Sequence, residues 1–307
     1  MVHSRCRGAT RGRLAGLGVA SLVFACLAAV PAVTMAAGPH SCSGTLKKPG
    51  VLAGTYPTGV VISGACEVNA GPVRVEGTLT LKPDSVLVAA FGRNHRTHKG
   101  GSSLTVTGNV DVGKGATLVL GCNPKSSPCV DDNQHQPKLT SRGAISGNVK
   151  ATSPLGILIH TSRIGGSVTE NGGGGGVNCT PAGVFKQLIK SPVFSTVEDS
   201  TVYGSISVSN LKTCWLGFAR VHVIGDLKVT GNKVADPDAI EILSNTVHKN
   251  LACQGNSQVW DSAEANSMSM ALYPRVPQPN TVDGKRSGQC VLASPATMGG
   301  PSGPGPF

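Results

Sequence analysis

The sequence predicts an all-β protein built as a parallel β-solenoid, in which short strands wind into stacked coils. Three observations carry this prediction. A seven-residue phrase recurs along the middle of the chain, its positions alternate between apolar and polar residues, and its third position is nearly always glycine. Composition agrees, since 41 of 307 residues are glycine while only 4% are aromatic and 14% charged. An aromatic-rich core and a highly charged disordered chain both fit these values poorly.

The first 36 residues are expected to be a secretory signal peptide. Four arginines within residues 5–13 form a basic segment without acids, residues 14–30 are apolar, and residues 34–36 offer small side chains for cleavage. A retained membrane anchor is disfavoured because glycines and Pro31 interrupt the apolar run, and lipid attachment at Cys26 is disfavoured by the preceding sequence. We therefore expect a protein that is secreted or held in the cell envelope, with no membrane span after signal removal.

The cysteines and the charge balance fit export. Eight cysteines follow the signal, an even number that indicates four disulfides in an oxidising compartment: Cys42, Cys66, Cys122, Cys129, Cys179, Cys214, Cys253 and Cys290. Spacing alone leaves their connectivity open, and no Cys-x-x-Cys motif supports a zinc ribbon or a thioredoxin site. The formal net charge of +11 falls to about +7 without the four signal arginines. A basic exported protein is attracted to anionic polymers.

The recurring phrase defines one strand-bend-strand unit. Its positions one, five and seven are mostly aliphatic and positions two, four and six mostly polar, a period of two that indicates β-strand. Glycine at position three marks a bend or a close backbone approach. Six copies and a worn seventh, with Lys249 in place of glycine, occupy residues 75–81, 106–112, 145–151, 164–170, 202–208, 223–229 and 247–253.

A second apolar run follows each bend at a nearly fixed offset, as in residues 86–88, 118–120, 157–159, 214–216 and 240–242. The bend positions are separated by steps of 31, 39, 19, 38, 21 and 24 residues. Short steps fit one coil, and long steps fit either a coil with an excursion or two coils of which one is degenerate. Stacked coils align their inward aliphatic residues and pair their backbones with neighbouring coils. The alternative, a β-sandwich, would normally have neither a recurring phrase nor a fixed bend glycine. The six-residue period of a left-handed hexapeptide solenoid is absent.

Two long polar excursions, Phe91 to Ser103 and Gly121 to Gly143, leave successive coils at corresponding points and should project from the same side. They carry the only concentration of site-like residues: Arg93, His95, Arg96, His98, Lys99, Asp131, Asp132 and His135. The first loop is interpreted as a cationic clamp for carboxylate, phosphate or sulfate groups, and Asp131 with Asp132 offers hard oxygens to a divalent cation. The alternative is that all eight are ordinary solvated loop side chains. His95-x-x-His98 with His135 could suggest zinc, but no His-Glu-x-x-His element or helix supports it, so neither a metal nor a cofactor is expected.

Other motifs carry less. The run Gly172 to Gly176 lacks the Lys-Ser/Thr ending of a phosphate-binding loop and is expected to be a flexible loop. Trp215 and Trp260 are too few and too scattered to form a platform for sugar stacking. No Gly-x-Ser-x-Gly elbow supports a serine hydrolase.

The ends of an open solenoid need covers, because exposed strand edges pair with other chains. We therefore divide the chain into a signal peptide (1–36), an N-terminal cap (37–65), the β-helix (66–256), a C-terminal cap (257–293) and a disordered Pro/Gly tail (294–307). The preferred tie for the C-terminal cap is a disulfide from Cys290 to Cys253.

These features resemble a group of uncharacterised exported bacterial proteins expected to be right-handed parallel β-helices. The resemblance rests on the Gly-Asn-Val phrases, on Asn250-Leu-Ala-Cys-Gln-Gly-Asn256, and on the closing segment from Asn280 to Cys290. It covers roughly Cys66 to Cys290 and implies fold and export, with no catalytic residues to transfer.

Function is accordingly expected to be structural or polymer-binding and non-catalytic, with an anionic glycopolymer or acidic polysaccharide as partner rather than nucleic acid. The alternative is a polysaccharide-active enzyme similar to pectate lyases. Of the motifs of polygalacturonases, only an Asp-Asp pair, Asp131-Asp132, is present, and fold analogy alone carries no activity.

Overall fold

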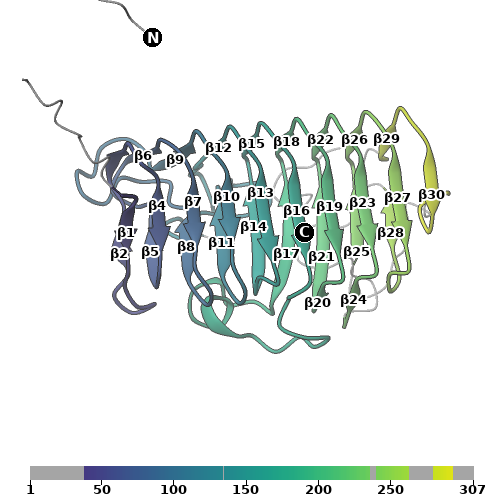
Figure 1. Cartoon of the computed structure of the whole chain (residues 1–307), viewed down its shortest axis with the longest axis horizontal. Coiled ribbons are helices and arrows are strands. Elements are labelled where there is room, and N and C mark those ends of the chain that lie inside the picture. Colours follow the sequence, from purple (N-terminus) through teal and green to yellow (C-terminus); the bar gives the residue numbers. More distant parts are fainter. Residues whose placement is uncertain (1–37, 134, 236–239, 263–278, 293–307) are drawn as a thin grey trace, which may run out of the picture. The chain divides into compact units, whose positions relative to one another are not determined.

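The computed structural model describes residues 38–292, apart from 134, 236–239 and 263–278 (Figure 1). The expected signal peptide (1–36) and the expected tail (294–307) lie outside the described residues. Residues 263–278 of the expected C-terminal cap also lie outside them. Among the residues that are described, no helix is long and apolar enough to cross a membrane.

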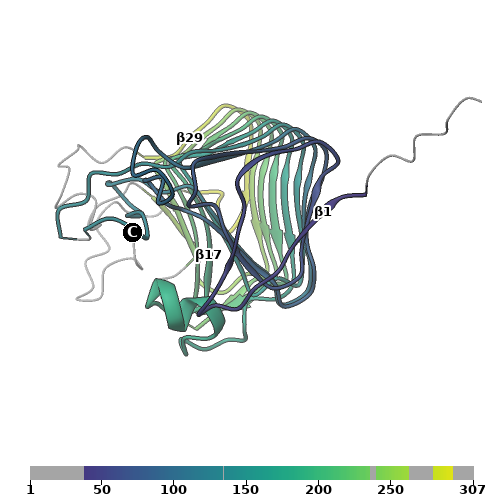
Figure 2. The ribbon, with the colours of Figure 1, turned by 90° about the vertical axis from the view of Figure 1, so that its left-hand side faces the viewer.

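The described chain is a parallel β-helix, which confirms the predicted fold class. Each coil contributes one strand to each of three parallel sheets, and Figure 2 shows these sheets as three sides around a common interior. Sheet I, the first strand of each coil, contains β1 (His40–Cys42), β4 (Val60–Ile62), β7 (Leu79–Leu81), β10 (Val110–Val112), β13 (Val149–Thr152), β16 (Val168–Asn171), β19 (Ile206–Ser209), β23 (Leu227–Thr230), β27 (Leu251–Gln254) and β30 (Arg286–Gly288).

The other two sheets follow in the same order along each coil. Sheet II contains β2 (Gly50–Val51), β5 (Ala65–Glu67), β8 (Val86–Ala89), β11 (Thr117–Leu120), β14 (Gly156–His160), β17 (Phe194–Glu198), β21 (Trp215–Ala219), β25 (Ile240–Leu243) and β28 (Trp260–Ser262). Sheet III contains β3 (Gly54–Tyr56), β6 (Pro72–Val75), β9 (Ser103–Val106), β12 (Gly143–Ile145), β15 (Arg163–Ile164), β18 (Thr201–Val202), β22 (His222–Val223), β26 (Thr246–Val247) and β29 (Thr281–Val282). A short pair, β20 (Lys212–Thr213) and β24 (Lys233–Val234), extends two coils between sheets I and II.

Every step between bend positions is one coil, and the long steps carry excursions. Loop one (residues 90–102) and loop two (121–142) connect sheet II to sheet III, and a third excursion (172–193) connects sheet I to sheet II. The third excursion contains a short π-helical turn, η1 (Phe185–Ile189). Within residues 37–65, the segment expected to be a cap, β1 to β3 form a coil of the same three sheets.

The core consists of aligned aliphatic columns. In sheet I the register places like residues above one another, as in the column Val60, Leu79, Val110, Val149, Val168, Ile206, Leu227 and Leu251, all of them buried. Burying aliphatic surface in this way stabilises each coil only against its neighbours, as expected for a solenoid.

The bend glycine is required by close backbone approach. A Cβ added at Gly147 would lie 2.7 Å from the carbonyl oxygen of Gly108. A Cβ added at Gly108 would lie 2.5 Å from the carbonyl oxygen of Gly77. From Gly108 onward, each bend N–H donates to the carbonyl of the bend one coil below, as from Gly147 to Gly108 at 3.0 Å. At position four of the phrase, side chains also form a ladder: the N–H of Asn148 donates to Oδ1 of Asn109, and that of Ser167 to Oδ1 of Asn148, both at 2.8 Å. Small polar residues recur there because they pair the bend with the next coil.

Four disulfides join the eight described cysteines: Cys42–Cys66, Cys122–Cys129, Cys179–Cys214 and Cys253–Cys290. The last confirms the predicted tie of the C-terminal cap. There, the side chain of Gln289 also pairs with Asn256. Four disulfides indicate that the protein folds in an oxidising compartment.

The expectation of a flexible five-glycine loop is corrected by the structure. All five residues from Gly172 to Gly176 have positive φ, between 69° and 101°. A Cβ at Gly173 would lie 2.1 Å from the carbonyl oxygen of Pro154, and the N–H of Gly176 donates to Lys212 at 2.9 Å. The glycines are therefore needed for a defined path that packs on neighbouring coils.

Candidate functional site: two paired basic loops

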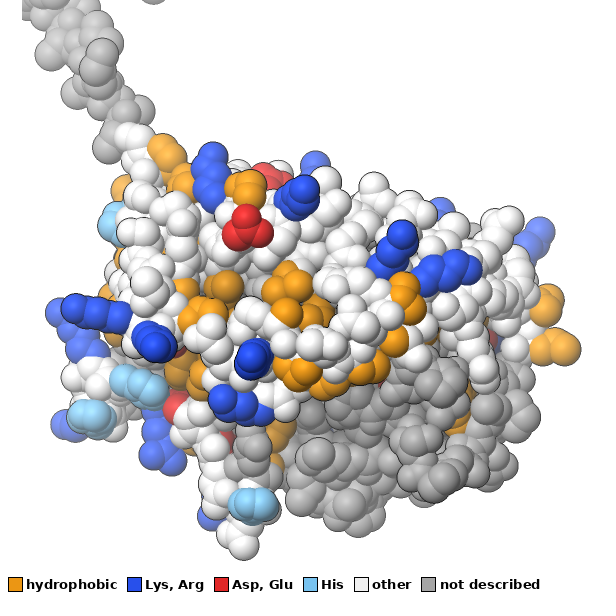
Figure 3. Space-filling view, turned by 90° about the horizontal axis from the view of Figure 1, so that it is seen from below, with side chains coloured by type: hydrophobic (Ala, Val, Ile, Leu, Met, Phe, Trp, Pro, Cys, Tyr) orange, Lys and Arg blue, Asp and Glu red, His pale blue; other side chains and the backbone are white. Residues whose placement is uncertain are grey.

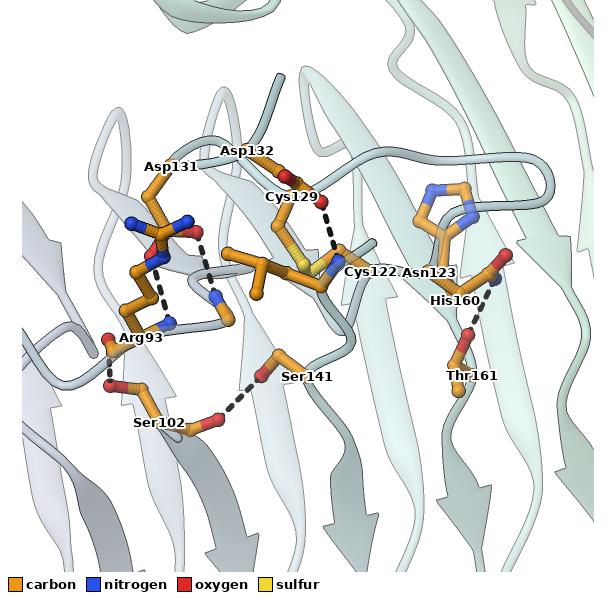
Figure 4. Close-up of a disulfide and its surroundings, with 12 residues drawn as sticks. Arg93, Ser102, Cys122, Asn123, Cys129, Asp131, Asp132, Ser141, His160 and Thr161 are labelled. Atoms are coloured by element: carbon orange, nitrogen blue, oxygen red, sulfur yellow. Dashed lines mark hydrogen bonds between the residues drawn. A yellow bond between two sulfur atoms is a disulfide. The ribbon is translucent and has the colours of Figure 1, made fainter. Parts of the chain in front are cut away.

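Loop one and loop two leave neighbouring strands and lie against each other. Their departure points are in register, since Ala89 of β8 pairs with Leu120 of β11. The N–H of Val130 donates to the carbonyl of Ala90 at 3.0 Å, and Ser141 Oγ donates to the carbonyl of Ser102 at 2.9 Å (Figure 4). The structure therefore brings the two predicted site loops together on one side of the β-helix (Figure 2).

Asp131 is the main connection between the loops. Its Oδ1 accepts the N–H of Gly92 at 2.7 Å, and its Oδ2 accepts the N–H of Arg93 at 2.8 Å (Figure 4). His95 Nε2 lies 3.0 Å from the same Oδ2. The Asp131 side chain is only 7% exposed, whereas that of His95 is 42% exposed. Asp131 thus holds loop one in place while the basic side chains around it remain accessible.

Asp132 organises loop two in the same way. Its Oδ1 accepts the N–H of Asn133 at 2.8 Å, and its Oδ2 accepts the N–H groups of Lys138 and Leu139. Desolvation opposes ionisation of Asp132, but these three backbone donors and the charge of Arg93 outweigh it and lower the pKa of this carboxyl. Asp132 is therefore a loop-organising anion.

The carboxylate oxygens of Asp131 and Asp132, which the sequence offered either to a divalent cation or to solvent, accept hydrogen bonds within the loops. The remaining predicted residues, Arg96, His98, Lys99 and His135, are exposed. Within the part of the chain that is described, no three His, Cys, Asp or Glu side chains are placed to share a metal ion.

A buried polar network anchors loop two to coils much later in the sequence. Cys122–Cys129 closes its first turn, and Asn123 Nδ2 donates to Thr161 Oγ1 at 2.6 Å (Figure 4). Asn123 Nδ2 also donates to Asp199 Oδ2 at 3.1 Å. Arg220 forms ion pairs with Asp199 at 2.7 Å and with Glu198 at 3.2 Å. Burial alone would raise the pKa of Asp199, but the hydrogen bond and charge of Arg220, with donors from loop two, lower it.

Sequence reasoning missed this network because its members are far apart, 76 residues in the case of Asn123 and Asp199. The available signal was Ser195-Thr-Val-Glu198, where polar residues interrupt the apolar run of sheet II. Buried polar groups in such a position need partners, so the sequence could have predicted that a loop packs against this segment.

The two loops present a surplus of positive charge. Six basic residues lie in them, Arg93, Arg96, Lys99, Lys125, Lys138 and Arg142, against the two acids Asp131 and Asp132. Five of the six are exposed and Lys125 is half-buried, whereas both acids accept hydrogen bonds inside the loops. Figure 3 shows Lys, Arg and His side chains gathered toward the N-terminal end of this face. The outward side chains of the two loops therefore carry predominantly positive charge.

An apolar hollow lies beside this surface, against the outward side of sheet II. Two adjoining cavities of about 210 and 350 Å³ share Leu46, Ala65 and Val86 in their lining. Glu67 lines the smaller one; burial raises its pKa, and the charge of His95 opposes this shift. Leu188 of the third excursion also lines the smaller cavity.

Comparison with protein-family models, with curated proteins and with solved structures finds no significant match to this chain.

Proposed function

We propose that this protein is an exported, non-catalytic β-solenoid that binds an anionic glycopolymer or an acidic polysaccharide through the paired basic loops. The observation that carries the proposal is the charge asymmetry of the loops: their cations point outward while their acids are tied to backbone N–H groups. A ligand with carboxylate, phosphate or sulfate groups would meet positive charge without a competing carboxylate.

The arrangement favours a polymer over a small anion. The cations are exposed and spread over two loops, so each exposed ion pair contributes at most about 1 kcal/mol. A repeating anionic chain engages several of them at once, and the contributions accumulate along a rigid scaffold. The rigidity comes from the coils, from Cys122–Cys129 and from the Asn123–Asp199 anchor.

Export and a position at the cell surface are part of the same proposal. The four disulfides support an oxidising compartment. The expected signal peptide and the resemblance to exported bacterial β-helix proteins support secretion from a bacterium, where envelope glycopolymers are the abundant polyanions.

The test is a binding screen of acidic and neutral glycans at about 0.1 M and about 1 M salt, between which the Debye length falls from about 10 to about 3 Å. We expect weak binding to acidic polymers that high salt abolishes. Replacing Arg93, Arg96 and Lys99 with Ser should weaken binding about tenfold or more, since three exposed charges contribute roughly 0.5 kcal/mol or more each.

A matched control replaces Lys82, Lys114 and Lys150 with Ser, which removes the same net charge from exposed positions outside the loops. We expect this variant to lose at most about twofold. Equal losses in the two triple variants, or salt-insensitive binding to a neutral glycan, would refute the loop site. Release of unsaturated or reducing ends would instead assign the protein to the polysaccharide-active enzymes.

A further inference from the structure

Two histidines meet on the outward side of sheet III, away from the loops described above. His222 lies in β22, and His248 directly follows β26 on the next coil. Their Nε2 atoms are 3.1 Å apart, and the rings meet edge to face with centroids 4.7 Å apart. Both side chains are exposed.

A carboxylate fixes the protonation pattern of this pair. Asp283, which follows β29 one coil further on, places Oδ2 2.7 Å from Nδ1 of His248. A carboxylate accepts at this distance, so Nδ1 of His248 carries the proton and its Nε2 presents a lone pair toward His222. The three side chains form a line from carboxylate to imidazole to imidazole.

We propose that His222 and His248 bind a divalent transition-metal ion of the zinc class between their Nε2 atoms, with Asp283 as the carboxylate behind the ligand. Two nitrogens about 2.0–2.1 Å from one zinc ion are about 3.3 Å apart at a tetrahedral angle and about 2.9 Å apart at a right angle, which brackets the observed separation. On binding, the ion takes the place of the proton between the rings, and His222 carries its own proton on Nδ1.

The Asp283 contact is the second observation that points to a metal. Histidine ligands of metal ions nearly always donate their other ring N–H to a carboxylate, a carbonyl or a water, which fixes the tautomer and makes the ligating nitrogen more basic. Asp283 has this position with respect to His248, and stacking of consecutive coils holds the three residues in register.

The chemistry selects the kind of ion. Imidazole nitrogens suit zinc, copper and nickel, whereas calcium and magnesium prefer oxygen ligands. The cysteines that would compete as softer ligands are held in disulfides throughout the described chain. No third ligating side chain completes the site within the described residues, so water or an external ligand fills the other positions.

The test is calorimetric titration of the tag-free protein with Zn²⁺, with Mg²⁺ as the contrasting ion. We expect saturable Zn²⁺ binding that His222→Ala and His248→Ala each abolish, and that Asp283→Asn weakens by about 10- to 100-fold. Mg²⁺ should give no such signal. His40→Ala removes another exposed histidine, one whose ring contacts Tyr56, and should leave the affinity unchanged.

Thermal unfolding in the same samples separates binding from misfolding. Zn²⁺ should raise the Tm of the wild-type protein and of His40→Ala, because a ligand of the folded state stabilises it, but not the Tm of His222→Ala or His248→Ala. Absence of saturable Zn²⁺ binding by the wild-type protein, or equal affinity of the wild-type protein and the His222→Ala/His248→Ala double variant, would overturn the proposal. Unchanged affinity in Asp283→Asn would overturn the role of the carboxylate.

Discussion

Sheets I and II are built by the same coils but have different surroundings. In β13, β16 and β23 of sheet I, buried and less buried residues alternate, so one side faces the core and the other faces solvent. In β8, β11 and β14 of sheet II, every residue is buried. An alternating pattern marks a half-covered sheet, and a continuous apolar run marks a sheet that is covered on both sides.

The third excursion supplies part of the cover over sheet II. Phe185 of η1 packs edge to face on Phe194 of β17, which stacks on Trp215 of β21 with ring centroids 4.0 Å apart. The Cys179–Cys214 disulfide fastens the excursion to the same sheet. Three aromatic residues thus dock the excursion on the outward side of sheet II.

The largest expected effect comes from breaking an inward column of sheet I. Val229 of β23 is fully buried between Val208 and Cys253, so Val229→Asp would place a carboxylate in the core without a partner. We expect loss of soluble folded protein, a destabilisation of more than about 4 kcal/mol. Yield and circular dichroism of the purified protein measure it.

Lys228→Asp is the paired control. Lys228 is exposed and forms a surface ion pair with Asp226 at 3.0 Å, so its replacement should cost about 1 kcal/mol or less. If Val229→Asp and Lys228→Asp behaved alike, the inward and outward assignments of sheet I would be wrong.

The same contrast between sheets I and II explains which parts of the fold could be predicted from the sequence alone. The phrase around each bend glycine encodes sheet I and the bend, because one residue in two faces a core that repeats from coil to coil. The cover of sheet II is not encoded locally: Phe185 meets Phe194 and Trp215 only when distant coils stack. For the same reason the Asn123–Asp199 anchor and the His222–His248 pair required the three-dimensional register.

For the paired loops, the sequence predicted that the two loops lie on the same side of the β-helix, but it did not predict the role of each residue in them. Equal departure points from β8 and β11 placed the loops side by side. The sequence left two interpretations of Asp131 and Asp132 open, oxygen ligands for a hard cation or ordinary loop side chains, and it predicted no metal. Their actual partners are backbone N–H groups, whose directions depend on loop conformation and cannot be derived from residue types.

A smaller effect tests the outward side of sheet II. Val119 of β11 is 6% exposed and lies in register between Val88 and Leu158. Because this side is covered, Val119→Asp should destabilise the protein by about 3 kcal/mol, measured as a loss of Tm and of denaturant midpoint.

The matched position on sheet I is Ser207 of β19, which points outward beside Lys228. Ser207→Asp adds the same carboxylate to a side that faces solvent and should change stability by no more than about 0.5 kcal/mol. Comparable losses in Val119→Asp and Ser207→Asp would mean that the two sheets do not differ in cover.

A pH-dependent effect concerns the one acid that the described residues place in an inward column of sheet I. Glu170 of β16 is in register between Ala151 and Val208, is 2% exposed, and accepts a hydrogen bond from Ser195 Oγ at 2.8 Å. Burial raises its pKa from 4.5 to about 8, against a lowering by the Ser195 hydrogen bond. The carboxyl is therefore protonated in the folded protein at neutral pH, and it is ionised in the unfolded chain.

This difference makes stability fall as pH rises. Below about pH 4.5 both states hold the proton, between about 4.5 and 8 only the folded state does, and above about 8 neither does. The free energy of unfolding should therefore decrease by up to about 1.4 kcal/mol per pH unit between pH 5 and pH 7.5. Glu170→Gln keeps a neutral partner for Ser195 and should remove this slope, whereas Glu76→Gln, at an exposed ion pair with Arg74, should retain it. Urea unfolding at several pH values measures the free energy of unfolding of the wild-type protein and of both variants. If this free energy changed with pH equally in the wild-type protein and in Glu170→Gln, Glu170 would be ionised in the folded core.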